Sequence, residues 1–149
     1  MQFQLRLQRG LLLPLALATV ALTSMQANAQ TSVYSPIPLP ASREVNDTLS
    51  DRDIPTGAGG FARDYTVDLE AGDQVAIDVI SDEFDTLVML MSADGTAISE
   101  NDDGPDGTTN SLLFARISES GTYTVRVRAY AGQGGGAFYL KVARLREVQ

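Results

Sequence analysis

The sequence lacks several side chains on which enzyme and metal chemistry usually depends. It has no cysteine, no histidine and no tryptophan, and Lys141 is its only lysine. Without histidine, the commonest general base and a common transition-metal ligand are both excluded. Serines are present, but none lies in a G-x-S-x-G nucleophile motif. Paired carboxylates can hydrolyse glycosides, yet a small all-β domain offers little cleft, so we predict no enzyme and rank a hydrolase as the least favoured function.

Basic residues are also few, and two of the 11 lie at the very start of the chain. Arg6 and Arg9 precede an apolar stretch at Leu11–Leu22, and Ala27-Asn28-Ala29 has the small-residue pattern of a cleavage site. A stretch of about a dozen residues is shorter than the roughly 20 that span a bilayer. Residues 1–29 are therefore predicted to be a cleavable signal peptide. The protein is expected to be exported, periplasmic or extracellular, with no membrane span after cleavage.

The remaining chain is strongly acidic. Cleavage after residue 29 leaves nine basic against 19 acidic residues, a net charge of −10. Such a protein is repelled by nucleic acid, so we predict no nucleic-acid partner. Because it has no cysteine, an exported domain of about 120 residues must be stable without disulfides, through its core and in part through a bound ion.

Prolines mark the segment between the signal peptide and the domain. Pro36, Pro38 and Pro40 alternate with other residues, which favours an extended conformation without backbone donors. Residues 30–42 are predicted to be a proline-rich linker or an edge segment. The domain is predicted to cover residues 43–146, and its first part, 43–60, is interpreted as a polar leader followed by a loop.

From residue 64 onward, short segments with period-two hydrophobicity follow one another at spacings near ten residues. Residues 65–69 and 75–79 alternate and are predicted to form a hairpin. Residues 86–91 are apolar on both parities, which is typical of a buried strand. Asp94-Gly95 then predicts a type I′ turn. Further strands are expected at residues 111–117, 123–129 and 138–142. The fold class is therefore predicted as all-β, an antiparallel, jelly-roll-like β-sandwich of about seven to eight short strands.

Six motifs occur together between residues 44 and 125. They are Glu44-Val45-Asn46-Asp47-Thr48, Asp64-Tyr65-Thr66-Val67, Phe84-Asp85-Thr86-Leu87, Ser92-Ala93-Asp94-Gly95-Thr96, Glu100-Asn101-Asp102-Asp103-Gly104 and Gly121-Thr122-Tyr123-Thr124-Val125. In this order they resemble the bacterial pre-peptidase C-terminal domain, a family related to the collagen-binding domains of clostridial collagenases. The resemblance implies a secreted, non-catalytic accessory module. No catalytic domain accompanies the module in this chain, so a secreted peptidase is a possible partner in trans.

The resemblance also implies a calcium site in the leader. In the collagen-binding relatives, calcium joins the leader to the first strand, and Glu44, Asn46, Asp47 and Asp64 match the positions that bind it. Carboxylate and amide oxygens are suitable calcium ligands. The alternative is that Asn46 and Asp47 only cap a turn. Calcium is thus the one cofactor predicted.

A second acidic group is formed by Asp85, Asn101, Asp102 and Asp103. It matches neither the EF-hand pattern nor the glycine-rich calcium repeats. Asn, Asp and Gly are also the usual residues of turns, so both a metal or ligand site and plain turn chemistry stay open.

Partner contacts are predicted at four residues of the last strands: Arg126, Arg128, Tyr130 and Tyr139. They are expected to be exposed, and the alternative is an ordinary solvated sheet face. An unknown protein or polysaccharide is the predicted partner, although the absence of tryptophan disfavours a sugar-stacking surface. The sequence predicts a secreted binding module, with a purely structural envelope subunit as the alternative, pairing through a sheet edge.

Overall fold

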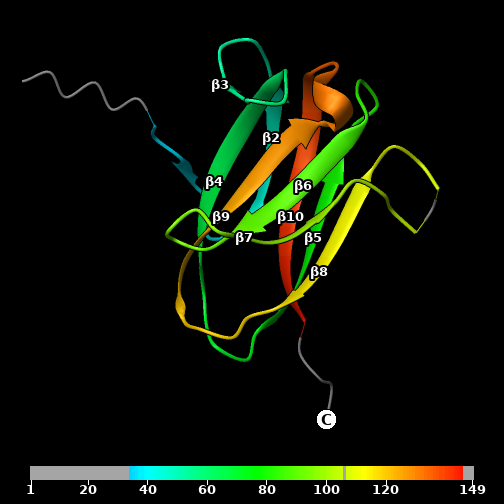
Figure 1. Ribbon diagram of the computed structural model, residues 1–149. Coiled ribbons are helices and arrows are strands. Elements are labelled where there is room, and N and C mark those ends of the chain that lie inside the picture. Colours follow the sequence, from blue (N-terminus) through cyan, green and yellow to red (C-terminus); the bar gives the residue numbers. More distant parts are fainter. Residues whose placement is uncertain (1–33, 106, 146–149) are drawn as a thin grey trace, which may run out of the picture. The chain divides into compact units, whose positions relative to one another are not determined.

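Two β-sheets packed face to face make up the part of the chain that the computed structural model describes, residues 34–105 and 107–145 (Figure 1). The predicted signal peptide lies outside these residues. The elements are β1 (Ile37–Pro38), β2 (Glu44–Leu49), β3 (Ile54–Pro55), β4 (Phe61–Leu69), β5 (Gln74–Ile80), β6 (Thr86–Met91), β7 (Ala97–Asn101), β8 (Ser111–Arg116), β9 (Gly121–Ala129), the 3₁₀ helix η1 (Tyr130–Gly132) and β10 (Gly136–Leu145).

The strands divide between the sheets in an order that differs from the sequence order. Sheet A has the order β1-β4-β9-β6-β7, with the short β3 also beside β4, and sheet B has the order β2-β10-β5-β8. All pairs are antiparallel except β1 with β4, which is parallel. The prediction of an all-β sandwich is confirmed. The number of strands exceeds the prediction because two-residue strands at the edges and β2 leave little trace in the hydrophobic pattern.

The core lies between the sheets and follows the predicted alternation. On β9 every second residue is buried, as it is on β5 and β10. The buried residues of these three strands are Val75, Ala76, Ile77, Val79, Tyr123, Val125, Val127, Ala129, Phe138, Leu140 and Val142. Each fully buried aliphatic or aromatic side chain contributes about 1.5–3 kcal/mol relative to exposure. Such a core stabilises the domain without disulfides.

The predicted hairpin of residues 65–69 and 75–79 is wrong. β4 lies in sheet A and β5 in sheet B, so the turn between them crosses from one sheet to the other. Gly72 and Asp73 pair instead with the end of β8: the Gly72 N–H donates to the Ile117 carbonyl and the Ile117 N–H to the Asp73 carbonyl. The alternation shows only that each strand has one buried face. Two strands can bury these faces against each other from opposite sheets just as two neighbouring strands of a hairpin bury theirs against a common core.

The predicted hairpin turn at Asp94-Gly95 is present, but its type differs. β6 and β7 pair antiparallel, and the Ser92 N–H donates to the Thr96 carbonyl across a three-residue loop. Only Gly95 has a positive φ, 85°, whereas a type I′ turn needs two such residues. The Gly95 N–H donates to the Ser92 carbonyl, so the loop is a turn followed by one left-handed glycine.

The N-terminal segments are more ordered than the sequence suggested. Within the proline-rich segment, Ile37 and Pro38 pair with β4, and the Leu39 N–H donates to the Thr66 carbonyl. These residues form an edge strand, the second of the two alternatives. The interpretation of 43–60 as a leader and loop is also incorrect over residues 44–49, because β2 pairs with β10 along its whole length.

Candidate functional site

The first predicted calcium ligand, Asp47, holds an ion-pair network between the two sheets. Its carboxylate accepts hydrogen bonds from the Arg63 Nε and the Tyr65 hydroxyl, each at 2.8 Å. Arg63 also donates through Nη1 to Asp53 at 2.5 Å. Burial alone would raise the pKa of Asp47, but the hydrogen bonds from Tyr65, Thr48 and Arg63 outweigh it and lower that pKa. Burial and the Asp47 charge raise the pKa of Tyr65.

Asp64, the second predicted ligand, lies on the outer face of sheet A and is fully enclosed. Its side chain is 0% exposed, and its two oxygens accept hydrogen bonds from the Nε and Nη2 of Arg126, each at 2.8 Å. The Tyr34 hydroxyl donates a third bond at 2.7 Å. Asp64 faces Arg126 directly in the register of β4 and β9, which explains the two-pronged pair.

The structure does not bring the four predicted ligands together. Glu44 and Asn46 lie on the outer face of β2, and the Glu44 carboxylate pairs with Lys141 at 2.9 Å. Asp47 points to the other face of β2, and Asp64 lies on the outer side of the opposite sheet. Among the described residues, no three His, Cys, Asp or Glu side chains are grouped as metal ligands. These residues as placed do not fit a calcium ion, because cationic side chains already occupy the carboxylates.

The second acidic group is likewise organised by turn chemistry. The Asn101 side chain donates to the Asp103 and Leu112 carbonyls, at 2.7 and 2.8 Å. The Leu112 N–H in turn donates to the Asp103 carbonyl, so Asn101 fastens the acidic loop to β8. Asp85 contributes its backbone carbonyl, which accepts a hydrogen bond from the Tyr130 N–H at 2.8 Å. Asp102 lines a hollow that is described below.

The four predicted partner-contact residues lie on opposite sheets. Arg126, Arg128 and Tyr130 belong to the outer face of sheet A and its end, because alternate β9 residues face outward. Tyr139 is on β10, so it lies on the outer face of sheet B beside Asn46 and Ile80. The Arg126 guanidinium is already paired with the Asp64 carboxylate. The four residues therefore do not share one surface, and Tyr139 lies apart from the other three.

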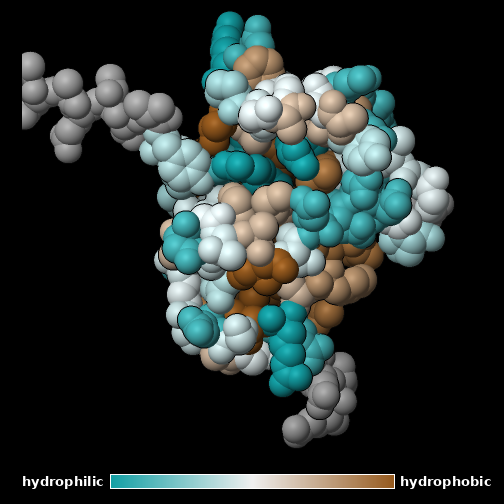
Figure 2. All heavy atoms as spheres, in the orientation of Figure 1, coloured by the Kyte–Doolittle hydropathy of each residue, from teal (hydrophilic) through white to brown (hydrophobic). Residues whose placement is uncertain are grey.

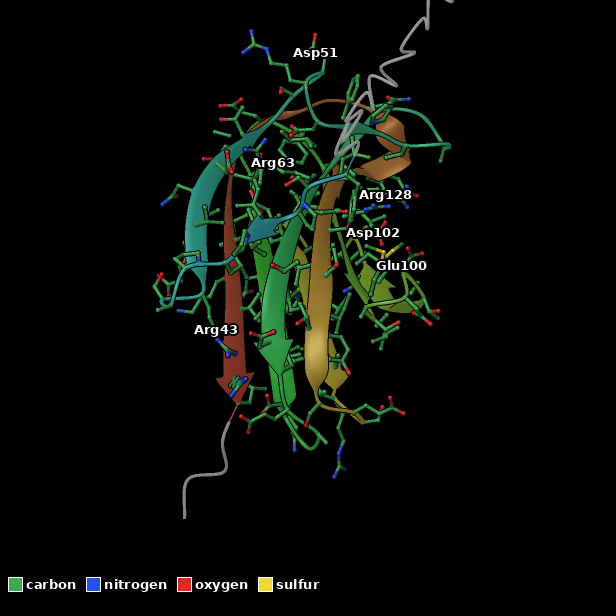
Figure 3. All side chains as sticks on the ribbon, turned by 90° about the vertical axis from the view of Figure 1, so that its left-hand side faces the viewer. Arg43, Asp51, Arg63, Glu100, Asp102 and Arg128 are labelled. Carbon is green, nitrogen blue, oxygen red and sulfur yellow. The ribbon has the colours of Figure 1, made fainter. Side chains whose placement is uncertain are left out.

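Arg128 and Tyr130 line a hollow at one end of sheet A. β6, β7, β9, η1 and the loop before β4 all contribute to it, and its residues are Ala58, Leu87, Glu100, Asn101, Asp102, Arg128, Tyr130, Ala131 and Gly132. Figure 3 shows Arg128, Glu100 and Asp102 on one side of the sandwich, apart from Arg63 and Arg43. We call this group the Arg128 hollow.

The Arg128 guanidinium is held at the base of the hollow with part of its hydrogen-bonding capacity unused. Arg128 lies opposite Ala62 of β4 and Leu87 of β6, and 22% of its side chain is exposed. Its Nε is buried and has no hydrogen-bond partner among the described residues. The nearest carboxylate, Glu100, is 4.0 Å from Nη2 and 54% exposed, so the pair is loose and adds little stability.

Two glycine-containing loops form the rim of the hollow. A Cβ on Gly132 would lie 2.5 Å from the Gly59 carbonyl oxygen, and one on Gly60 would lie 2.6 Å from the Gly132 oxygen. Both glycines have φ of +69°. The two loops therefore approach each other closely only because both residues lack a side chain. Tyr130, which is 48% exposed, stands beside this contact with its N–H bound to the Asp85 carbonyl.

Apolar side chains continue from the hollow across the outer face of sheet A. On the outer side of β6, Leu87 and Met91 are buried and Met89 is partly exposed, and Ile98 on β7 is 44% exposed. Figure 2 shows exposed apolar groups in the middle of this face, with hydrophilic groups around them. An apolar centre with a polar rim is the usual composition of a protein-binding surface. Sequence reasoning missed Leu87 and Glu100 as members of the hollow, because the apolar residues of both parities at 86–91 indicated only a buried strand.

Comparison with known proteins agrees with this description. Residues 62–129 match the family model of the bacterial pre-peptidase C-terminal domain. Comparison with curated proteins found no match. Among solved structures, the fold is similar to PliG of Aeromonas hydrophila, a periplasmic inhibitor of g-type lysozyme. The TM-score is 0.55 at 15% identity, over 74% of this chain and 96% of that one. It is also similar to the pre-peptidase C-terminal domain of a Bacillus anthracis collagenase, with a TM-score of 0.54 at 12% identity, over 73% and 95% of the two chains.

The fold shared with these structures is a two-sheet β-sandwich. The resemblance to the bacterial pre-peptidase C-terminal domain family that was seen in the sequence is confirmed over residues 62–129. In the part of the chain that the structure describes, no helix has the length and apolarity required to cross a membrane.

Proposed function

We propose that this protein is an exported, non-catalytic module that binds a protein partner through the Arg128 hollow. The observation that carries the proposal is the buried Arg128 Nε, which lacks an acceptor and lies beside the exposed ring of Tyr130. A buried donor without a partner is costly, and an acceptor from a ligand would remove that cost. Export is supported by the family and by the periplasmic neighbour.

The chemistry of the hollow defines the part of the partner that it accepts. A carboxylate or backbone carbonyl of the partner would accept a hydrogen bond from the Arg128 Nε–H. The Glu100 carboxylate would move aside, because its ion pair with Arg128 is weak at a distance of 4.0 Å. Tyr130 supplies a large, rigid surface beside this point, and aromatic and arginine residues are enriched among binding hot spots. The partner therefore inserts an acidic or carbonyl-bearing loop and covers the apolar face of β6.

Binding to exported hydrolases tests the proposal. The first defined probe is g-type lysozyme, because the structurally similar PliG inhibits it, and an unfractionated set of exported proteins from the source cells is the second. We expect a captured protein whose binding falls about tenfold or more in Arg128→Ala, as removal of a hot spot requires. Arg52→Ala is the matched control, since Arg52 is exposed and does not line the hollow. Equal binding by both variants would overturn the proposed site.

A polysaccharide is the competing ligand class, and a structural envelope subunit is the competing role. The hollow has one aromatic ring, Tyr130, whereas sugar platforms usually present larger aromatic surfaces. A glycan array probed with the same two variants separates these cases: Arg128-dependent glycan binding would replace the protein partner, and no binding of either kind would leave the structural role. The calcium site that the sequence predicts is put to the test in the Discussion.

A further inference from the structure

The edge of sheet B formed by β8 has an exposed aromatic residue at its centre. β8 pairs with β5 on one side only, and Figure 1 shows it at the border of the sheet. Phe114 is 63% exposed, more than any other large apolar side chain in the described residues. It lies next to Arg116 on the outer face of the sheet, and a hollow lined by Gln74, Phe114 and Leu145 adjoins them. Arg116 forms no ion pair with a described residue.

The backbone of β8 offers hydrogen-bonding groups along this edge. Ile117 donates its N–H towards Asp73 at the start of β5, so residues of the same parity, such as Ala115, face β5. Residues of the other parity face outward, and the outward N–H of Leu112 is already bound to the Asp103 carbonyl. The N–H and carbonyl groups of Phe114 and Arg116 therefore point away from the sheet. Together they offer two donors and two acceptors to a neighbouring strand.

The other long sheet edges in the described part of the chain are partly protected by contacts within the chain. At β2, the outward Thr48 N–H is bound by the Asp47 side chain, and the Glu44 N–H by the Ser42 hydroxyl. β1 lies within a segment of alternating prolines. At β7, the Asn101 side chain ties the edge to β8. The second half of β8 is thus the edge most open to pairing.

We propose that two copies of this chain pair antiparallel through β8, with a twofold axis at Ala115. The outward groups of Phe114 would then meet those of Arg116 in the second copy, and both pairs are related by the axis. This arrangement forms four backbone hydrogen bonds and joins the two B sheets into one. Each Phe114 ring lies beside the Arg116 guanidinium of the second copy, in position for a cation–π contact.

Self-pairing fits this edge better than an unrelated strand because its two outward residues complement each other. With a two-residue spacing, each aromatic ring faces a cation, and no like charges are opposed. The interface is small, so association is weak and is opposed by the net negative charge of each chain. It leaves the Arg128 hollow free on the opposite sheet, and it does not depend on the proposed function.

A single introduced cysteine tests the geometry directly. Ala115 of each copy would be a directly opposed, non-hydrogen-bonded pair, with Cα atoms about 4.5 Å apart, a separation that a disulfide bridges. Because the chain has no cysteine, Ala115→Cys carries the only thiol. Mild oxidation at high protein concentration should give a covalent dimer. Ile98→Cys, at an exposed position on sheet A, should remain monomeric under the same conditions. Equal crosslinking of both variants would overturn the proposal.

Sedimentation equilibrium of the unmodified chain provides the second test. We expect the apparent mass to rise from one chain towards two with concentration. Phe114→Pro and Arg116→Pro each delete an N–H that points away from β5, so the bonds within the sheet remain. Two donors are lost from each dimer per substitution, which should weaken association about tenfold. A monomer at every concentration, or a dimer that both proline variants leave unchanged, would contradict pairing through β8.

Discussion

Asp47 is expected to stabilise the fold by joining the two sheets, and Asp47→Ala tests this. The substitution leaves the Tyr65 hydroxyl without its 2.8 Å acceptor, and Tyr65 is 1% exposed. It also removes one of the two carboxylates that bind Arg63.

The magnitude follows from the exposure of each partner. A buried hydroxyl that loses a bond to a charged acceptor costs about 1.5–3 kcal/mol. The Arg63 pair is a quarter exposed on both sides, so solvent screening limits it to about 0–1 kcal/mol. We therefore expect the free energy of unfolding to fall by about 2–3 kcal/mol. In a domain of this size that lowers Tm by roughly 8–12 °C.

Chemical denaturation of four proteins measures the effect: wild type, Asp47→Ala, Tyr65→Phe and the double variant. Because the carboxylate and the hydroxyl bind each other, the double-mutant cycle should give a coupling energy of about 1 kcal/mol or more. Asp51→Ala is the control, since Asp51 is exposed in the loop after β2 (Figure 3) and should change stability by less than about 0.5 kcal/mol. A coupling energy near zero, or equal effects of Asp47→Ala and Asp51→Ala, would refute the network.

Three further predictions concern the other carboxylates. Arg126→Ala strands the fully buried Asp64 carboxylate, so thermal unfolding should show a loss of about 3 kcal/mol or more, while Arg126→Lys should retain part of the stability; a loss under about 1 kcal/mol would contradict the pair. Hydrogen bonds from Ser92 and Thr96 lower the pKa of Asp94 to about 2, and the pKa of Asp47 is also lowered. Both carboxylates therefore stabilise the fold above pH 3.8, the ordinary pKa of an aspartate. This stability is lost as the pH falls through their pKa values in the folded protein. Unfolding followed by circular dichroism at several pH values should show this loss of stability, and Asp47→Asn should make stability depend less on pH. An unchanged pH dependence in Asp47→Asn would contradict the lowered pKa of Asp47. Millimolar calcium should leave Tm equal to that in chelator, because the predicted ligands are paired with cations; a rise that Asp47→Ala abolishes would restore the predicted calcium site.

The local pattern of the sequence was sufficient for most of the long strands, but not for β2 or for the way in which the strands pair. Period-two alternation correctly predicted the buried residues of β9 and β10, and a turn signal correctly predicted the β6–β7 hairpin. The β4–β5 pair was wrong because alternation shows that a strand has one buried face without showing which sheet it joins. Pairing of β4 with β9 depends on contacts between residues about 60 positions apart, which no local signal records.

The predicted site residues illustrate the same limit. Motif matching selected Asp47 and Asp64 as ligands, but the register of β4 and β9 places Arg126 against Asp64, and Arg63 reaches Asp47 across the core. Their role as ion-pair partners could not be deduced without this register. Arg128 and Tyr130 line one hollow because they lie close in sequence at the end of β9. Tyr139 lies on the other sheet, and outward parity alone could not show which sheet each residue joins.

Site-specific photocrosslinking at the two tyrosines tests the binding surface most directly. A photoreactive phenylalanine analogue replaces Tyr130 at the Arg128 hollow in one variant and Tyr139 on the outer face of sheet B in the other. Both variants are irradiated with the proteins exported by the source cells. The proposed function predicts a discrete crosslinked protein at position 130, and its loss when Arg128→Ala is added. Crosslinks at position 139 alone, or crosslinks at position 130 that do not depend on Arg128, would contradict a binding site in the hollow.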